Sequence, residues 1–461
     1  MVLFTAGWWW RATWIQDYQL PHDERLYFIH FGFMAFVALA IVAWFLGDLH
    51  GLTELFDSGS ILWIIPFLQL AVWGRISYGA DVRNAEIAFS SAVQLITVSA
   101  FTLTVAANAP SARATAFTLT ASMVLLVFVG IAQSAVQHDL KLHVLFDPLG
   151  LDIRELTLDP ARSGISVVET VDGTRYLRPY SLTAHPNLTA GLVAMGLAAA
   201  SGLWMNQNRR WAAFALGIGW WGLLLSFSRS ALVAFFIGGV FFAGMYLIYL
   251  YRNSTRDEDS ATNDSRTGFT SIQPIFQTLK SIIRRDVLPL IMLFVVVGMI
   301  FAALYYPLIA VRYGIQKPDT PTLETLSSAS RAVYIEEAGQ LIRENPLKGV
   351  GIGNMPWESA WMLRNDPRDL RGDNVHNIYL LSLSEVGIVG FGLYIGAIGI
   401  AFLLFLRRTW QGKTSVVQIS LMTGVMIWLA IGWYEHYPWS QFGYQLIFWG
   451  VLAIALHHNE L

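Results

Sequence analysis

The sequence predicts an all-α polytopic membrane protein with about 11–12 transmembrane helices and one long, mainly helical outer loop. Of its 461 residues, 55% are hydrophobic and only 13% are charged, and the mean hydropathy is +0.49. A soluble protein carries roughly 25% charged residues. Several apolar runs extend over about 20 residues, which is the length at which an α-helix crosses the ~30 Å hydrocarbon core of a bilayer.

Charge and cysteine content exclude several classes of function. The chain has 30 basic and 32 acidic residues, and its net charge of −2 argues against a nucleic-acid partner. Because it has no cysteine, it can form neither disulfides nor cysteine metal sites, and it cannot use thiolate catalysis. No cleavable signal peptide is expected, since Arg11, Asp17 and the charged run at 23–25 interrupt residues 1–25.

Hydropathy predicts a single transmembrane domain over residues 1–461. The expected spans lie near 26–46, 61–77, 87–108, 113–136, 188–205, 211–227, 229–251, 287–310, 376–406, 416–434 and 438–457. The long span that starts at His376 is expected to break near the glycines at 387–390. This count puts the two termini on opposite sides, so a twelfth segment near the N-terminus stays open.

The basic residues of the short loops predict the orientation. They gather on one side, which the positive-inside rule makes cytoplasmic. They are Arg209, Arg210, Arg252, Lys280, Arg284, Arg285, Arg407, Arg408 and Lys413. The two long loops, 137–187 and 311–375, then face the periplasm or the cell exterior. The polar segment 252–286 is expected to be a disordered cytoplasmic linker.

The first outer loop is expected to contain a β-hairpin. Two runs with β-forming residues, 165–171 and 174–178, flank the dipeptide Asp172-Gly173. Such a dipeptide between β-rich runs favours a tight hairpin turn.

The second outer loop is expected to be helical. Ser327 or Ser328 can cap a helix that starts near Ala329, and the Asn-Pro pair at 345–346 should end it. Its apolar face would consist of Ile335, Ala338, Leu341 and Ile342. The glycines at 349, 351 and 353 then predict a flexible turn, which by itself is weak evidence for phosphate binding.

Two arginines and one histidine could carry chemistry at the outer surface. Arg229 starts a span, and Arg331 is expected in the first turn of the loop helix. Each could bind phosphate oxygens through its guanidinium. Equally, Arg229 could reach up to lipid headgroups, and Arg331 could lie on a solvated helix face.

His376 is expected in the first turn of a span, with Asp373 or Asn374 as the N-cap. The positive end of the helix dipole would lower the imidazole pKa and keep the ring neutral. A neutral imidazole near pH 7 can act as a general base. The alternative is an interfacial histidine bonded to headgroups.

Several short motifs resemble the bacterial O-antigen ligase and O-antigen polymerase superfamily. The similarity runs from about Arg178 to the C-terminus, whereas residues 1–140 match only in hydropathy. The motifs are YSLTAHPNL at 180–188, LSFSRSA at 225–231, SR at 330–331, NPLKGVG at 345–351, HNIY at 376–379, EVG at 385–387 and EHYPW at 435–439.

This resemblance implies a GT-C-like, metal-independent membrane glycosyltransferase of the bacterial inner membrane, with its active site on the periplasmic face. Such enzymes move a glycan from an undecaprenyl-diphosphate carrier to a glycolipid or glycan acceptor, without a cofactor. By motif, His376 corresponds to the catalytic base, and Arg229 and Arg331 to the ligands of the diphosphate. Arg178 is a further candidate ligand. Neither outer loop contains an Asp-x-Asp motif for Mg²⁺, which agrees with a metal-independent reaction.

Three functions remain open from the sequence. A ligase would attach the glycan to lipid A-core or a similar acceptor, and the His-Asn motif at 376–377 favours this reading. A polymerase of the same superfamily would attach it to another carrier-linked repeat. A lipid-linked glycan transporter would instead place its charged residues near the bilayer midplane.

Overall fold

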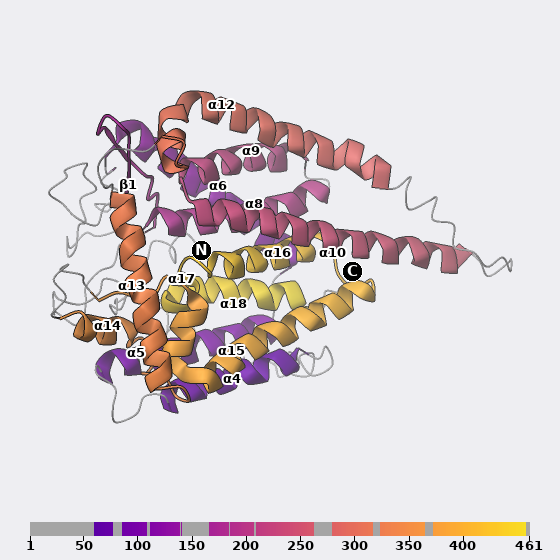
Figure 1. Ribbon diagram of the computed structural model, residues 1–461. Helices are drawn as coiled ribbons and strands as arrows, with labels where there is room; N and C mark the ends of the chain where they lie inside the picture. The colour runs from indigo at the N-terminus through magenta and orange to yellow at the C-terminus, as the bar shows by residue number, and fades with distance from the viewer. Residues whose placement is uncertain are drawn as a thin grey trace.

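The computed structural model describes residues 60–76, 85–107, 111–138, 140, 166–183, 185–206, 209–261, 279–316, 323–364 and 372–457. Within them the protein is a bundle of apolar helices with a small loop region at one end (Figure 1). The bundle helices are α4 (Ile61–Ile76), α5 (Ala85–Ala107), α6 (Ala112–Val136), α8 (Pro186–Met205), α9 (Arg209–Leu225), α10 (Arg229–Ala261), α12 (Leu288–Arg312), α15 (Ile378–Trp410), α16 (Val416–Ile431) and α18 (Phe442–Leu456).

These helices confirm the predicted fold class of an all-α polytopic membrane protein. Five helices of the described residues are long and apolar enough to cross a bilayer, and five more are shorter apolar helices. Every predicted span from residue 61 onward overlaps one of them. The predicted span at 26–46 lies outside the described residues.

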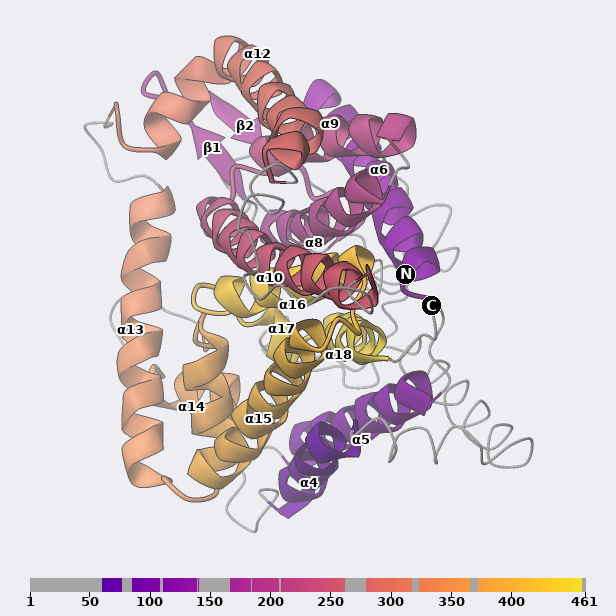
Figure 2. The same cartoon turned by 90° about the vertical axis from the view of Figure 1, so that its right-hand side faces the viewer.

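Helix α8 forms the centre of the bundle. Nearly all of its side chains are buried, and it packs against α6, α9 and α16. Viewed along the bundle, α4 and α5 lie on one side of this centre and α6, α9 and α12 on the other (Figure 2). The N-terminal end of α8 therefore lies inside the molecule, at the end of the bundle that carries the loops.

The loop region contains the predicted hairpin. Strands β1 (Val167–Glu169) and β2 (Arg175–Leu177) pair antiparallel, with Val168 opposite Tyr176. Gly173 takes the turn with a φ of 82°, a conformation that glycine adopts without steric cost.

The loop helix α13 (Leu323–Glu344) crosses the end of the bundle, roughly perpendicular to its helices (Figure 1). It ends where the Asn-Pro pair predicted, but it begins at Leu323, so the expected cap at Ser327 or Ser328 is wrong. The predicted apolar face is correct at its centre and wrong at Ile335, which is 51% exposed.

Helix α15 is broken at Gly387, as its glycines predicted. Gly387 has a φ of 63° and a ψ of −174° inside the helix. The loop that follows α13 occupies the break, because Val350 N donates to Ser384 O and Gly351 N donates to Glu385 O, each at 2.9 Å. The predicted glycine turn at 349–353 thus supplies the hydrogen bonds that the broken helix lacks.

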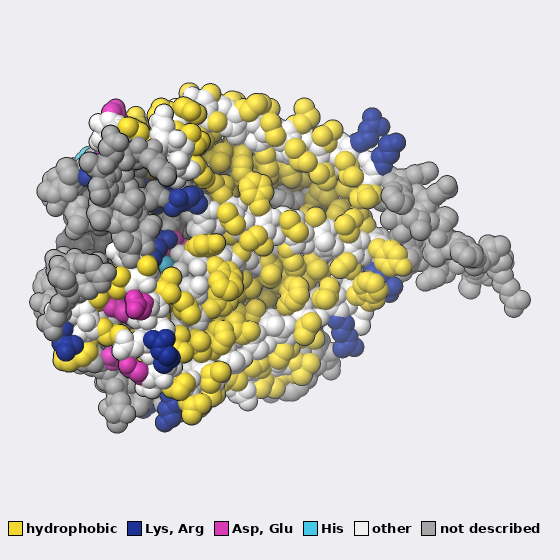
Figure 3. Space-filling model, viewed as in Figure 1, with side chains coloured by type: hydrophobic (Ala, Val, Ile, Leu, Met, Phe, Trp, Pro, Cys, Tyr) yellow, Lys and Arg dark blue, Asp and Glu magenta, His cyan; other side chains and the backbone are white. Residues whose placement is uncertain are grey.

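The surface has an apolar belt between two polar ends (Figure 3). The basic residues of the short loops belong to the end away from α13, where α10 and α15 finish and the π-helix η2 (Ile283–Val287) leads into α12. Helix also replaces both ends of the expected linker 252–286, because α10 continues through Ala261 and helix resumes at residue 279. Residues 262–278 lie outside the described part.

Candidate active site

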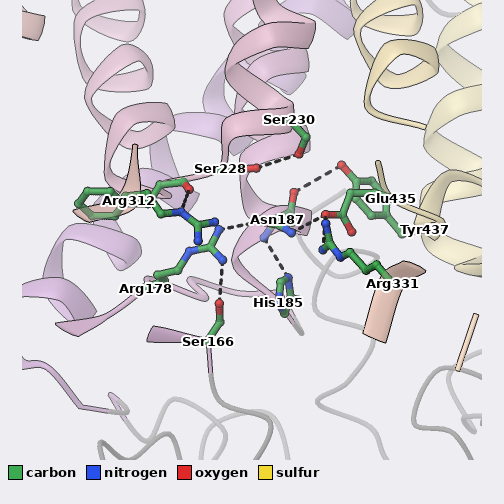
Figure 4. A network of polar contacts seen from close by, with 11 residues as sticks. Ser166, Arg178, His185, Asn187, Ser228, Ser230, Arg312, Arg331, Glu435 and Tyr437 are labelled. Atoms are coloured by element: carbon green, nitrogen blue, oxygen red, sulfur yellow. Dashed lines mark hydrogen bonds and ion pairs between the residues drawn. The ribbon is translucent and has the colours of Figure 1, made fainter. Parts of the chain in front are cut away.

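A polar network lies at the loop end of the bundle, among segments that are far apart in the sequence (Figure 4). It joins the N-terminus of α8, the turn between α9 and α10, helix α13 and the segment that precedes α17 (Tyr437–Ser440). The segment that precedes α15 lies beside it, because the ring of His376 contacts that of His436. Several of its charged side chains are buried, so their contacts define the site.

The N-terminus of α8 places Asn187 at the centre of the network. His185 caps the helix, and its Nδ1 accepts a hydrogen bond from the backbone amide of Asn187 at 3.2 Å. Pro186 takes a first-turn position, where the absence of an N–H costs nothing. Tyr437 donates its hydroxyl to the backbone carbonyl of Asn187 at 3.4 Å. The side-chain amide of Asn187 is thereby directed into the site.

Arg178 is buried, with 4% of its surface exposed, and three of the hydrogen bonds described for it hold its guanidinium. Its Nε donates to the carbonyl of Ser226 at 2.9 Å, Nη1 to Ser166 Oγ at 2.7 Å, and Nη2 to Asn187 Oδ1 at 2.6 Å. The guanidinium therefore ties the hairpin, the α9–α10 turn and α8 to one another.

The turn between α9 and α10 exposes Arg229. Phe227 adopts a left-handed conformation with a φ of 50°, and its carbonyl accepts from Arg312 Nε at 3.0 Å. Arg229 is exposed at the start of α10, and its Nη1 donates to the backbone carbonyl of Arg312 at 3.5 Å. Arg312, which the sequence analysis did not single out, thus fixes the turn that carries Arg229.

Arg331 reaches into the network from α13. It lies in the third turn of this helix, not in the first turn as expected, because α13 starts early. Its Nη2 is 3.5 Å from Oε1 of the buried Glu435, which also accepts a hydrogen bond from Asn187 Nδ2. Its Nε is buried and has no hydrogen-bond partner among the described residues. The Arg331 guanidinium is therefore only partly satisfied by the protein.

His376 lies one residue before the N-cap of α15. The cap is Asn377, whose side chain accepts from the amides of Tyr379 and Leu380, so the expectation of Asp373 or Asn374 as the cap is wrong. His376 is half-buried, and its Nδ1 has no hydrogen-bond partner in the described part of the chain.

Burial is the main cause that lowers the pKa of His376 well below its ordinary value. Electrostatic interactions with His436, with Arg331 and, more weakly, with His185 lower that pKa further. The direction agrees with the sequence analysis, but the leading cause is burial and not the end of a helix. The His376 imidazole is therefore neutral near pH 7.

His436 and Glu435 were part of a motif, yet the sequence analysis gave neither a role. The His436 ring is buried and shares a 2.7 Å hydrogen bond between its Nδ1 and Ser440 Oγ. Burial raises the pKa of Glu435 above its ordinary value, and the charge of Arg331 opposes this shift. Only the folded chain shows that both residues lie beside His376 and Arg331.

The candidate residues of the sequence analysis thus fall into two groups. Arg178 and Arg331 are linked through Asn187 and Glu435, and His376 lies close enough for Arg331 to affect its pKa. No contact between Arg229 and this group is described, although Arg178 binds the turn that carries it. In the described residues no group of three or more His, Cys, Asp or Glu could hold a metal ion.

The comparison with known families bears on the same segments. The model of a family described as O-antigen ligase matches residues 211–395, from α9 to the middle of α15. The matched segment contains Arg229, Arg331 and His376, whereas Arg178 and Glu435 lie outside it. A search of curated proteins gave no match. Segment 211–395 therefore resembles the O-antigen ligase family, and it lies within a chain whose apolar helices are those of a multi-pass membrane protein.

Proposed function

We propose that the protein transfers a glycan from undecaprenyl diphosphate to a hydroxyl group of a glycolipid or glycan acceptor. The bond between the anomeric carbon and the diphosphate oxygen breaks as the acceptor oxygen bonds to that carbon from the opposite side. The acceptor proton passes to His376, and undecaprenyl diphosphate leaves. In-line attack of this kind inverts the anomeric centre.

The observation that carries the proposal is the neutral imidazole of His376 beside the partly satisfied guanidinium of Arg331. A general base must be unprotonated at the working pH, and the lowered pKa of His376 meets this requirement. A leaving diphosphate needs its developing charge stabilised, which a guanidinium can do. The two groups that the reaction requires lie close enough for the charge of Arg331 to lower the pKa of His376.

The arginines take different parts in this proposal. Arg331 and Arg229 are the ligands of the diphosphate, since the first has an unpartnered Nε and the second is exposed. Arg178 was a candidate ligand too, but its guanidinium is buried and bound to three protein oxygens. We propose instead that Arg178 supports Asn187 and the α9–α10 turn.

The loop end is proposed to face the periplasm, with the protein in the bacterial inner membrane. The basic residues of the short loops belong to the opposite end of the bundle, which supports this orientation (Figure 3). Loops 137–187 and 311–375 would then lie on the outer side and 252–286 in the cytoplasm.

Transfer is favoured over transport by the position of the charged groups. The network lies at one end of the bundle, where loops meet helix ends (Figure 4). A transporter is expected to hold its charged residues near the midplane of the bilayer.

One experiment distinguishes the ligase from the polymerase. Purified protein in lipid nanodiscs is given carrier-linked oligosaccharide, with and without a second glycolipid acceptor. Products that form only when the acceptor is added support a ligase, which we favour. A ladder of longer oligosaccharides from the single substrate supports a polymerase. If neither product forms while carrier-linked glycan crosses the bilayer of liposomes, the protein is a transporter.

A further inference from the structure

A buried carboxylate lies in the network without a part in the proposed reaction. Glu435 follows α16 and is 5% exposed. Burial of a carboxylate costs several kcal/mol unless charged or polar partners compensate for it. A carboxylate that is buried at this cost beside Arg331 is therefore expected to have a role in the site.

The contacts of Glu435 connect two arginines. Its Oε1 accepts a hydrogen bond from Asn187 Nδ2 and lies 3.5 Å from Arg331 Nη2. The same amide of Asn187 accepts at Oδ1 from Arg178 Nη2 at 2.6 Å. One carboxylate therefore meets one arginine directly and the other through a single amide group (Figure 4).

The two arginines depend on this carboxylate to different extents. Arg178 has two further hydrogen bonds, to Ser226 and Ser166, and these hold it in place without Glu435. For Arg331 the contact with Glu435 is the one ion pair described. Since Arg331 belongs to α13, which lies across the end of the bundle, this ion pair also fixes the charged group of the loop helix to the bundle.

We propose that Glu435 is a positioning residue for the leaving diphosphate. It holds the Arg331 guanidinium over the site before the substrate binds, so that the phosphate meets a cation already in place. Placing a charged group in advance lowers the barrier, because the group need not be ordered during the reaction. The role rests on the proposed transfer function and extends it to a residue outside the matched segment 211–395.

The test compares Glu435→Gln with wild-type protein in the nanodisc assay. The amide keeps the size of the side chain and its acceptor for Asn187, but it loses the charge that holds Arg331. We expect kcat to fall about 10- to 100-fold, the loss typical of one charge-assisted hydrogen bond. The KM for the carrier-linked glycan should change less than kcat. Glu336→Gln removes an exposed carboxylate from α13 and should leave both constants unchanged.

A second comparison separates positioning from simple support of the fold. If Glu435 acts through Arg331, Glu435→Gln should add almost no loss to Arg331→Gln, which leaves no charge for Glu435 to hold. Equal losses in the two backgrounds would show that Glu435 acts independently and would overturn the proposal. So would wild-type kcat in Glu435→Gln.

Failure of the Glu435→Gln variant to fold and failure of the wild-type protein to transfer glycan have different consequences. If Glu435→Gln does not fold, Glu435→Asp is used instead, because it keeps the buried charge but moves it away from Arg331 by one methylene. The kcat of Glu435→Asp should still fall. Wild-type kcat in that variant would overturn the positioning role. Absence of transfer by the wild-type protein would overturn the proposed function itself. Active wild-type protein with unaffected Glu435 variants would overturn only the positioning role.

Discussion

The imidazole rings of His376 and His436 meet edge to face, with their centroids 5.0 Å apart and their planes at 86°. Two rings this close are unfavourable when both are protonated, so His436 disfavours the charged form of His376. The partner ring is itself fixed by Ser440. The proposed base thus owes part of its neutrality to a histidine 60 residues further along the chain.

The pH dependence of transfer should show this arrangement. A base is active when unprotonated, and a lowered pKa means that His376 becomes protonated only at a pH below that of an ordinary histidine. We therefore expect kcat/KM to hold as the pH falls through about 6.5, the ordinary histidine pKa, and to decline only at lower pH. His436→Gln should move this decline to higher pH. If Glu435→Gln shows a decline at the same pH, the group that titrates is His376 and not Glu435. If His436→Gln leaves the pH of the decline unchanged, the two rings are not coupled.

Replacement of His376 by alanine should remove catalysis and little stability. Loss of a general base typically lowers the rate about 10²–10⁴-fold. The half-buried ring has an unpartnered Nδ1 among the described residues, so few favourable contacts are lost. Transfer rate and thermal unfolding are measured side by side, with the exposed His138→Ala as the control. Full transfer by His376→Ala would rule out the assignment.

Arg331→Lys should lower the transfer rate substantially, although it keeps the positive charge. Lysine keeps the charge but loses the planar fork that bonds phosphate oxygens, at a cost of roughly 1.5–3 kcal/mol. Arg229→Lys should also lower kcat, and the double variant should be little worse than the poorer single one if both arginines bind one diphosphate. Transfer kinetics of the three variants check this, with exposed Arg343→Lys as the control. Fully additive losses would mean that the two arginines do not share a ligand.

Gly349 and Gly387 should not tolerate alanine. Both have positive φ, and a Cβ at either would lie 2.3 Å from backbone atoms of the other segment. We expect each alanine variant to lose about 1–3 kcal/mol of stability from the strained conformation alone. Gly392→Ala is the matched control, because a Cβ there meets nothing within 4 Å and lies within the same helix. Thermal unfolding in detergent gives the comparison, and equal unfolding temperatures for Gly387→Ala and Gly392→Ala would contradict it.

The proposed orientation can be tested because the chain has no cysteine. Single cysteines replace Gln340 on α13 and Lys413 after α15, both of which are exposed. A membrane-impermeant thiol reagent added to spheroplasts should label the first and spare the second until the membrane is opened. The reverse pattern would invert the topology and place the site in the cytoplasm.

The sequence predicted the features that local rules govern. Hydropathy located the spans, the Asp-Gly pair located the hairpin, and the glycines near 387 located the break in α15. The start of α13 was missed because Ser327 and Ser328 are good caps in isolation, while the helix continues through them. Ile335 was misplaced because a helical repeat shows which residues share a face but not where its edge lies.

The site was predicted only as far as single residues carry chemical signals. His376 and Arg331 could be chosen from their residue types and expected positions. Asn187 and Glu435 could not, because they are 248 residues apart and each is ordinary by itself. The burial of Arg178 could not be predicted from the sequence either, because the groups that surround it come from the hairpin, α8 and the α9–α10 turn.

The break in α15 has a consequence for biogenesis. The apolar run is long enough to enter the bilayer as one continuous helix, in which the carbonyls of Ser384 and Glu385 would be bonded within the helix. In the folded protein they are bonded instead to Val350 and Gly351, so the bend can form only once the glycine turn has folded against it. We therefore expect the candidate site to form late in maturation, after the spans are inserted and the loop between α12 and α15 has reached its final side of the membrane.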